Sequence, residues 1–161
     1  ATMAAALGLT EQDLAPTPLG HFEGGPSFLY VELAHLDALG RARICEPAFT
    51  KTRETAGDTG AIYAFVRTGP ASIQARMFDP PAGIPEDPAT GSATAILAGQ
   101  LLATGVLPEG TSVWTLRQGV EMGRPSDLRL SVDVTAGAMT AIRVAGSAVK
   151  IAEGRIRIPR A

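Results

Sequence analysis

The feature that most constrains the fold is an apolar run from Ala93 to Ala103, which has the length and composition of a helix. Inside the run only Thr94 and Gln100 are polar, so the predicted helix has no polar face. A helix that is apolar all round is normally buried. Small residues dominate the run, and they allow surrounding backbone to approach closely. We therefore expect the helix to be buried on all sides, with the rest of the chain around it.

Most of the remaining chain favours strands and turns. Alternating or β-branched patterns predict strands over residues 27–34, 61–68, 72–78, 112–118, 128–135, 140–144, 148–152 and 155–158. Many short strands and one buried helix indicate an α+β domain whose sheet wraps around the helix. The length of 161 residues suits a single domain, 1–161, with a core of its own.

Shorter elements connect these strands. A helical turn over 3–7 is closed by Gly8, residues 10–13 resemble a capping box, and 35–43 favour a short helix along Leu36 and Leu39. The segment 47–60 is expected to be a polar loop. Prolines predict a stiff, non-regular segment over 79–85.

Charge and cysteine content exclude several classes of function. The net charge of −2 gives no basic surface for nucleic acid or for an anionic membrane. No apolar run approaches the roughly 20 residues of a membrane span, and the first residues lack the pattern of a signal peptide. Cys45 is the only cysteine, so a reducing, cytoplasmic location is expected. Position 1 is not Met, and we expect the chain to be processed or part of a longer protein.

The segment 86–93 is where we expect chemistry. It places Asp87 just before the predicted helix, and Gly91 and Ser92 at the start of that helix. The first N–H groups of a helix lack intrahelical partners and attract anions. A carboxylate beside such an end can move a proton on a substrate that carries its own carboxylate. The alternative is structural, since an acid, a glycine and a serine also cap and stabilise ordinary helix starts.

Other polar residues give weaker signals. Glu86 is expected to be structural or to face solvent, and Trp114 to lie in the core or at a domain contact. His21 and His35 lack metal-ligand spacing, so no metal site is predicted. Arg117 and Arg124 could reach an anionic substrate, although solvated surface charges would look the same in the sequence. Ser92 has no neighbouring histidine and no Gly-x-Ser-x-Gly turn, so a nucleophilic role is not indicated.

These motifs resemble a known family. The residues of 86–93, EDPATGSA, resemble the signature of the phenazine-biosynthesis PhzF-like isomerases. Flanking segments agree with the family in order and spacing; they are 76–84, RMFDPPAGI, 118–126, QGVEMGRPS, and 144–149, VAGSAV. Gly25-Pro26 also fits. The resemblance runs from about Leu7 to Arg157 and therefore covers most of the chain.

The resemblance implies a diaminopimelate-epimerase-like fold. Such proteins have two similar domains, each a strongly bent, barrel-like mixed sheet around one central helix, with the active site between them. This chain resembles the second, C-terminal domain, and the first domain is expected to be absent from it. The first domain should supply a glutamate acid/base and a histidine. The implied activity is cofactor-independent proton transfer on a small carboxylate-bearing metabolite, with Asp87 opposite that glutamate and the carboxylate docked on Gly91 and Ser92.

Two other functions stay open at this point. A lone domain without chemistry could bind small carboxylates at the helix end or act in assembly, with the first domain or a homodimer partner covering the cleft. A thiol-dependent epimerase would instead use Cys45, because thiol-based epimerases of the same fold place cysteines at the cleft. The presence of Asp87 in the corresponding region favours carboxylate chemistry over thiol chemistry.

Overall fold

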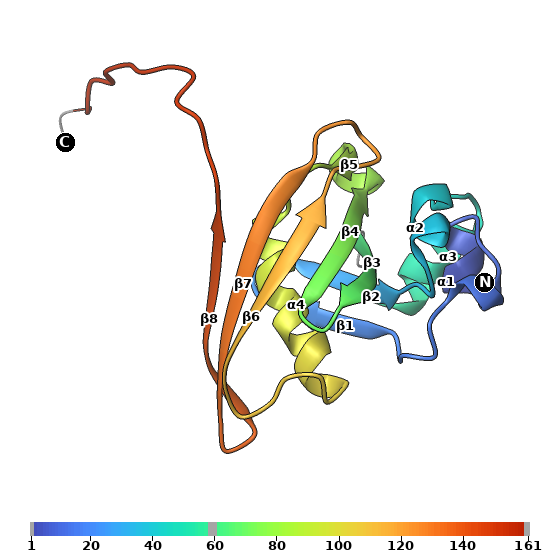
Figure 1. Ribbon diagram of the computed structural model, residues 1–161. Helices are drawn as coiled ribbons and strands as arrows, with labels where there is room; N and C mark the ends of the chain where they lie inside the picture. The colour runs from blue at the N-terminus through green and yellow to red at the C-terminus, as the bar shows by residue number, and fades with distance from the viewer. Residues whose placement is uncertain (1, 58–60, 160–161) are drawn as a thin grey trace.

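The computed structural model describes residues 2–57 and 61–159 (Figure 1). Its strands are β1 (Gly20–Glu23), β2 (Ser27–Glu32), β3 (Ala61–Gly69), β4 (Ser72–Asp79), β5 (Ile84–Asp87), β6 (Gly110–Gln118), β7 (Ser126–Thr135) and β8 (Ala138–Gly146). The α-helices are α1 (Met3–Ala6), α2 (Leu36–Arg41), α3 (Ala48–Thr55) and α4 (Gly91–Ala103), and 3₁₀ turns occupy Glu11–Asp13 and Pro80–Ala82.

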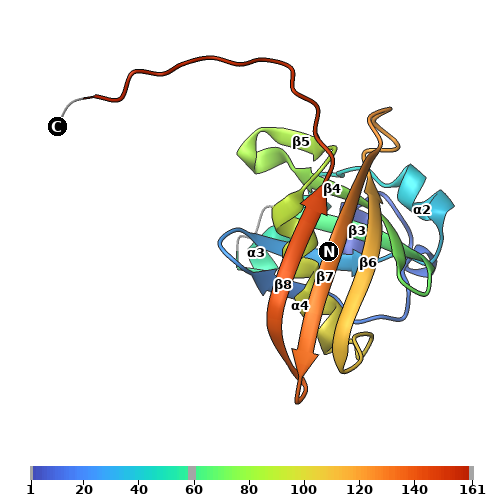
Figure 2. The ribbon, with the colours of Figure 1, turned by 60° about the vertical axis from the view of Figure 1, so that its left-hand side comes forward.

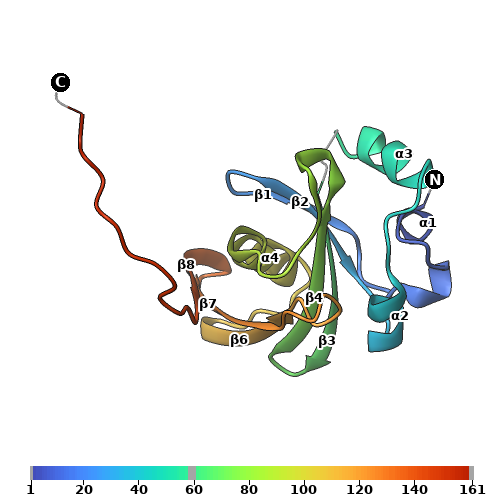
Figure 3. The same cartoon turned by 90° about the horizontal axis from the view of Figure 1, so that it is seen from above.

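All strands belong to one strongly curled mixed sheet. Its order is β1-β2-β3-β4-β6-β7-β8, with β5 paired to β4. The pairs β2–β3 and β4–β6 are parallel, and the other neighbours are antiparallel. Seen from above, the sheet curves around α4, and its two ends, β1 and β8, approach the helix from either side (Figure 3). The predicted fold class, a strongly bent sheet around a central helix, is confirmed.

The two parallel connections put helices on opposite faces of the sheet. The chain passes from β2 to β3 through α2 and α3, and from β4 to β6 through α4. Both crossovers step the same way along the strand order, but β4 runs antiparallel to β3. Because such crossovers are almost always right-handed, reversing the strand direction moves the helix to the other face. Accordingly, α4 lies inside the curve and α1–α3 lie outside it (Figure 3).

The inner core surrounds α4. Its buried side chains come from α4 and from the concave face of nearly every strand. Tyr30, Tyr63, Leu97, Leu116 and Leu130 are all at most 1% exposed. Among them, Tyr30 and Tyr63 stack at a tilt, with ring centroids 5.5 Å apart.

The expectation that this helix is buried on all sides is wrong. Ser92 and Ala103 are exposed, and Ala95, Ile96 and Gly99 are half-buried. Ala95, Ile96 and Gly99 face the gap between β1 and β8, which are the two unpaired ends of the strand order. A hollow of about 320 Å³ lies there, and Ile96, Phe22 of β1 and Ile142 of β8 are among the residues that line it. The sheet is therefore a half-barrel, and its opening leaves one stripe of α4 uncovered.

An outer core lies between the convex face and α1–α3. It contains Leu29, Val31, Ile62, Ala64, Val66 and Phe78 from the sheet, with Leu39 and Phe49 from the helices and Leu7 from the C-cap of α1. Its helix α3 corrects the predicted loop over 47–60. Phe49 is its only buried residue among those described, so no periodic apolar stripe marked it. The predicted helix over 35–43 is confirmed as the shorter α2.

The C-terminal segment also differs from expectation. Residues 148–152 and 155–158 were expected to be strands, yet residues 147–159 have no regular secondary structure. They extend away from the body in all views (Figures 1, 2 and 3). Val149, Ile151, Ile156 and Ile158 are 83–92% exposed. Alternating apolar and polar residues suit a strand that buries one face in a sheet, and no described strand pairs with these residues.

Two smaller differences concern short strands. Residues 79–85 were expected to be non-regular, but β5 begins at Ile84 and pairs with β4. The strand β1 was not predicted, because its sequence GHFE is short and contains a glycine. No helix in the described part of the chain is long and apolar enough to cross a membrane.

Candidate functional site

The β4–β5 hairpin separates the two acids of the motif. Asp87 of β5 lies opposite Met77 of β4, so both side chains are on the same, inner face of the sheet. Because successive side chains of a strand point to opposite faces, Glu86 is directed outward. Of the two acids, Asp87 is the one on the inner face, next to the start of α4.

Glu86 has a structural role, as predicted. Arg76 donates from Nε and Nη2 to its two carboxylate oxygens, each at 2.8 Å. The Nη1 of Arg76 also donates to the backbone carbonyls of Leu39 and Ala42, at 2.9 and 2.8 Å. Arg76 is only 8% exposed, and its guanidinium lies 4.8 Å from the ring centre of Phe78. This arginine fixes β5, and with it the residue before Asp87, to the end of α2.

The N-terminus of α4 has no side-chain cap among the described residues. Thr90 is the N-cap residue, but its side chain makes no capping hydrogen bond. The first intrahelical bond runs from Thr94 N to Thr90 O, so the N–H groups of Gly91, Ser92 and Ala93 lack intrahelical partners. Ser92 is exposed and Gly91 half-buried. The structure thus leaves free donors and the positive end of the helix dipole beside Asp87.

Instead of capping the helix, Thr90 bonds to Asp87. Its hydroxyl donates to Asp87 Oδ2 at 2.6 Å. Gln118, at the end of β6 and fully buried, holds the same loop with both ends of its amide. Its Nε2 donates to Asp87 O at 2.7 Å and to Thr90 Oγ1 at 2.9 Å, while its Oε1 accepts from Thr90 N at 3.2 Å.

Gly119 allows the following turn to pack against this loop. Its φ is +77°, and an added Cβ would lie 2.4 Å from Arg124 O and 2.9 Å from Pro88 O. Both neighbours are backbone atoms, so neither can move without shifting a loop. Gln118 and Gly119 together therefore clamp residues 87–90 from the β6 side.

Two buried tyrosines complete the surroundings of the helix start. Tyr30 Oη donates to Ala93 O at 2.7 Å, and Tyr63 Oη approaches Gln118 Oε1 at 3.4 Å. Burial raises the pKa of both phenols well above the ordinary value. Both phenols therefore stay protonated even in alkaline solution and can act as hydrogen-bond donors.

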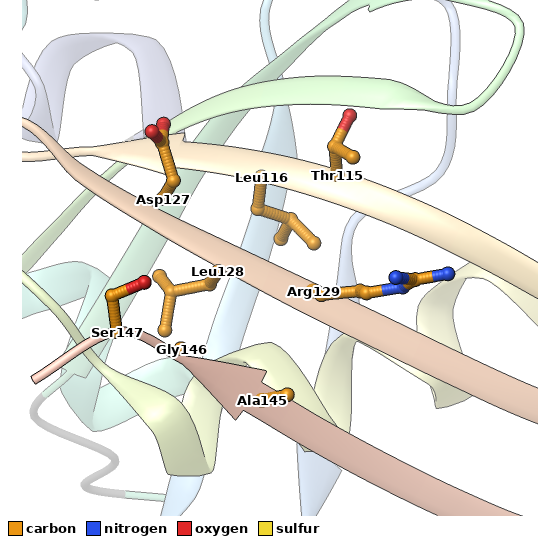
Figure 4. A pocket seen from close by; sticks show the side chains of 8 residues that line it. All are labelled: Thr115, Leu116, Asp127, Leu128, Arg129, Ala145, Gly146 and Ser147. Atoms are coloured by element: carbon orange, nitrogen blue, oxygen red, sulfur yellow. The ribbon is translucent and has the colours of Figure 1, made fainter.

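A hollow adjoins the loop where β8 ends. A polar part of about 300 Å³ is lined by Ala89, Ser126, Asp127 and Ser147, among others. It shares Asp127, Leu128, Gly146 and Ser147 with a larger part of about 520 Å³ along β6–β8. Asp127 and Ser147 lie at one end of this larger part and Arg129 at the other (Figure 4). Space for a small molecule therefore exists next to the motif loop.

The structure brings Asp87, Gly91 and Ser92 together and leaves the other candidates elsewhere. Cys45 lies in the outer layer, where its N–H donates to Ala6 O. Its Sγ would lie 2.9 Å from a Cβ at Gly8.

The structure gives His35 a capping role and leaves Arg117 and Arg124 at the surface. His35 accepts at Nδ1 from Ala38 N and so caps α2. Arg117 is 60% exposed at the side chain and faces Asp127 at 3.9 Å, and Arg124 is exposed in the β6–β7 turn. Trp114 is 3% exposed and belongs to the inner core. Within 2–57 and 61–159, no three His, Cys, Asp or Glu side chains gather in a way that could hold a metal ion.

Sequence reasoning missed Thr90, Gln118 and Arg76 as residues that shape the site. One signal was present for Gln118. In the alternation of β6, Gln118 falls on the same inward-facing side as Trp114 and Leu116. The pattern therefore places its polar amide in the core. Buried amides need partners, and a search for them could have pointed to the motif loop.

Comparisons with known proteins agree with this architecture. The phenazine biosynthesis-like protein family, PhzC-PhzF, matches residues 1–154. A trans-2,3-dihydro-3-hydroxyanthranilate isomerase of Pseudomonas fluorescens is 33% identical, over 94% of this chain and 51% of its own length. An uncharacterized isomerase of Mesorhizobium japonicum is 32% identical, over 96% of this chain and 53% of its own length. The chain thus spans about half the length of the curated relatives it matches.

Solved structures share the fold. A PhzF-family phenazine biosynthesis protein of Bacillus anthracis superposes with a TM-score of 0.73, at 17% identity, over 91% of this chain and 54% of that one. A protein of Pseudomonas aeruginosa, described as a predicted epimerase, gives a TM-score of 0.64 at 28% identity, over 90% and 49%. Because the family match covers nearly the whole chain, this protein belongs to the PhzC-PhzF family of phenazine biosynthesis-like proteins.

Proposed function

We propose that this chain forms one half of an isomerase active site that moves a proton on a small carboxylate-bearing metabolite without a cofactor. The observation that carries the proposal is the position of Asp87 beside the uncapped N-terminus of α4. Membership of a family whose relatives are named isomerases supports it. The trans-2,3-dihydro-3-hydroxyanthranilate isomerases are named for a substrate that carries a carboxylate.

Each group has a distinct task in this proposal. The substrate carboxylate accepts hydrogen bonds from the N–H groups of Gly91 and Ser92 and from the Ser92 hydroxyl. Asp87 exchanges a proton with one carbon of the bound substrate, while an acid/base on the opposite wall exchanges a proton with another carbon. One proton is removed and one is returned, so the composition of the substrate does not change. The positive helix end stabilises the charge that develops in between.

The opposite wall is expected to come from outside these 161 residues. In our proposal it belongs to a first domain of the same protein, which supplies a glutamate and a histidine, or to a second copy of the chain. The half-length match to the relatives supports this part of the proposal. Activity is therefore expected of the complete protein, and the isolated chain is expected to be inactive or nearly so.

The test is solvent-deuterium incorporation into trans-2,3-dihydro-3-hydroxyanthranilate by the complete protein. Asp87→Asn should slow it by about 10²–10⁴-fold, the usual contribution of a positioned acid/base group. Asp37→Asn is the matched control, because Asp37 is exposed beside Arg41 on α2, and it should keep the original rate. Exchange at the normal rate in Asp87→Asn, or no exchange by the unaltered protein, would overturn the proposal.

A second candidate is a binding module without chemistry, which the half-length match also favours. In this reading small carboxylates bind at the start of α4 and are released unchanged. Amide resonances of Gly91 and Ser92 in the 161-residue chain should then shift with anthranilate and not with aniline, which lacks the carboxylate. Isomerase activity in this chain alone would exclude the module. The thiol alternative receives no support, since Cys45 lies in the outer layer, across the sheet from α4.

A further inference from the structure

We infer that Gln118 and Thr90 are positioning residues that set the direction of hydrogen bonding to Asp87, and thereby decide which carboxylate oxygen is available to the substrate. The inference rests on the proposed role of Asp87. In this inference a residue of β6, a strand distant in sequence from the motif, controls the orientation of the Asp87 carboxylate.

The orientation of the Gln118 amide is dictated by two backbone groups. Asp87 O can only accept a hydrogen bond, and Thr90 N can only donate one. The amide must therefore turn Nε2 toward Asp87 O, at 2.7 Å, and Oε1 toward Thr90 N, at 3.2 Å. The reverse orientation would face donor with donor and acceptor with acceptor. Because Gln118 is fully buried, no solvent is at hand to compensate such a mismatch.

This orientation fixes the Thr90 hydroxyl in turn. Gln118 Nε2 carries two hydrogens and no acceptor, and its second hydrogen points to Thr90 Oγ1 at 2.9 Å. Thr90 Oγ1 must accept that bond, so its own hydrogen is left for Asp87 Oδ2, at 2.6 Å. Thr90 is 7% exposed. The chain of donors thus runs one way, from Gln118 through Thr90 to Asp87.

The consequence for Asp87 is that its two oxygens differ. Oδ2 is held by the Thr90 hydroxyl, and no side chain or backbone group within the described ranges donates to Oδ1. The bond also fixes the rotation of the carboxyl group relative to the start of α4. Oδ1 is therefore the oxygen that takes and returns the proton, and its place is set by a residue 31 positions further along the chain.

The test compares Thr90→Val and Thr90→Ser in the complete protein. Valine keeps the shape of threonine and the backbone bonds to Gln118 but removes the hydroxyl, whereas serine restores it. We expect Thr90→Val to lower kcat for solvent-deuterium incorporation by about 10-fold or more, the scale of a misplaced reacting group, with KM nearly unchanged. Tm should fall as well, because the second Nε2 hydrogen of the buried Gln118 loses its acceptor. Thr90→Ser should recover most of kcat. A purely structural role would lower Tm but leave the kcat of the folded enzyme unaltered.

Gln118→Met provides the second variant. It removes both ends of the amide, so its effect on kcat should not add to that of Thr90→Val in the double variant, because the two residues act through one chain of bonds. Independently of activity, the Gln118 side-chain amide protons should exchange slowly by NMR in the unaltered protein. Rapid exchange of those protons would overturn the inference.

The outcomes also separate this inference from the proposed function. If Asp87→Asn abolishes exchange and Thr90→Val retains the normal kcat, the positioning role is wrong and the role of Asp87 stands. If Asp87→Asn itself retains the normal rate, the proposed function fails and the positioning role fails with it.

Discussion

Gly119 offers the sharpest test of how tightly the β6–β7 turn is packed against the motif loop. Gly119→Ala introduces a Cβ 2.4 Å from Arg124 O and 2.9 Å from Pro88 O, at a φ of +77°. A left-handed backbone conformation costs an L-residue about 1–2 kcal/mol, and overpacking adds about 1–3 kcal/mol. The lower conformational entropy of the unfolded alanine chain returns about 0.4–1 kcal/mol. We expect a net loss of about 1–5 kcal/mol in the free energy of unfolding, with a central value of about 3 kcal/mol.

Gly123→Ala is the matched control in the same turn. Its φ is +68°, and no heavy atom of the described chain lies within 4 Å of the added Cβ. Only the backbone cost applies, so the loss should be about 1 kcal/mol. Urea unfolding followed by far-UV circular dichroism measures both. Since 1 kcal/mol shifts Tm by about 2–4 °C at this size, thermal melts should show the same difference. Equal losses in the two variants would refute the close approach of Gly119 to Pro88.

Three further predictions test other parts of the structure. Arg76→Met should lower the free energy of unfolding by up to about 3–5 kcal/mol, because it leaves the half-buried Glu86 carboxylate, 17% exposed at the side chain, without its partner. The exposed Arg117→Met should cost less than about 1 kcal/mol, and similar losses for the two variants in urea melts would contradict this. Hydrogen bonds from the Thr10 backbone and hydroxyl, and Arg41, lower the pKa of Asp13 to about 2. The stability that ionised Asp13 contributes is thus present above the unfolded pKa of about 3.9 and is lost as the pH falls through about 2. Asp13→Asn should therefore make the free energy of unfolding depend less on pH between about pH 4 and 2. Parallel curves of stability against pH for the two proteins would exclude this role of Asp13. Truncation after Ser147 should change the free energy of unfolding by less than about 0.5 kcal/mol, because Val149, Ile151, Ile156 and Ile158 are exposed; a clear drop in the urea midpoint would show that they pack on the body.

Prediction from sequence succeeded where local pattern decides structure. The mostly apolar run predicted α4 within two residues of its observed start, and alternation predicted β2, β3, β4, β6 and β7. It failed where structure depends on contacts distant in the chain. The helix α3 is held by one buried side chain, Phe49, and residues 148–158 have a strand pattern without a strand neighbour.

The same distinction applies to the site. Asp87, Gly91 and Ser92 could be named because they are adjacent in sequence and match a motif. Their roles remain predictions. Thr90 was not among the predicted site residues, because its bond to Asp87 emerges only once Gln118 occupies the position beside it. A contact between residues 31 positions apart leaves no periodic pattern in a single sequence. The clamp of Gln118 on residues 87–90 could therefore be identified only from the structure.

The strand β3 contributes side chains to both cores, which affects how the molecule unfolds. Tyr63 and Phe65 enter the inner core, while Ile62, Ala64 and Val66 enter the outer one. A slip of one residue would exchange the two sets and force tyrosine and phenylalanine into spaces shaped for smaller side chains. Neither core can therefore loosen around β3 without the other, so its amide hydrogens should exchange with solvent only when the whole molecule unfolds. The two faces of a single strand thereby join the helical layer and the half-barrel around α4 into one cooperative unit.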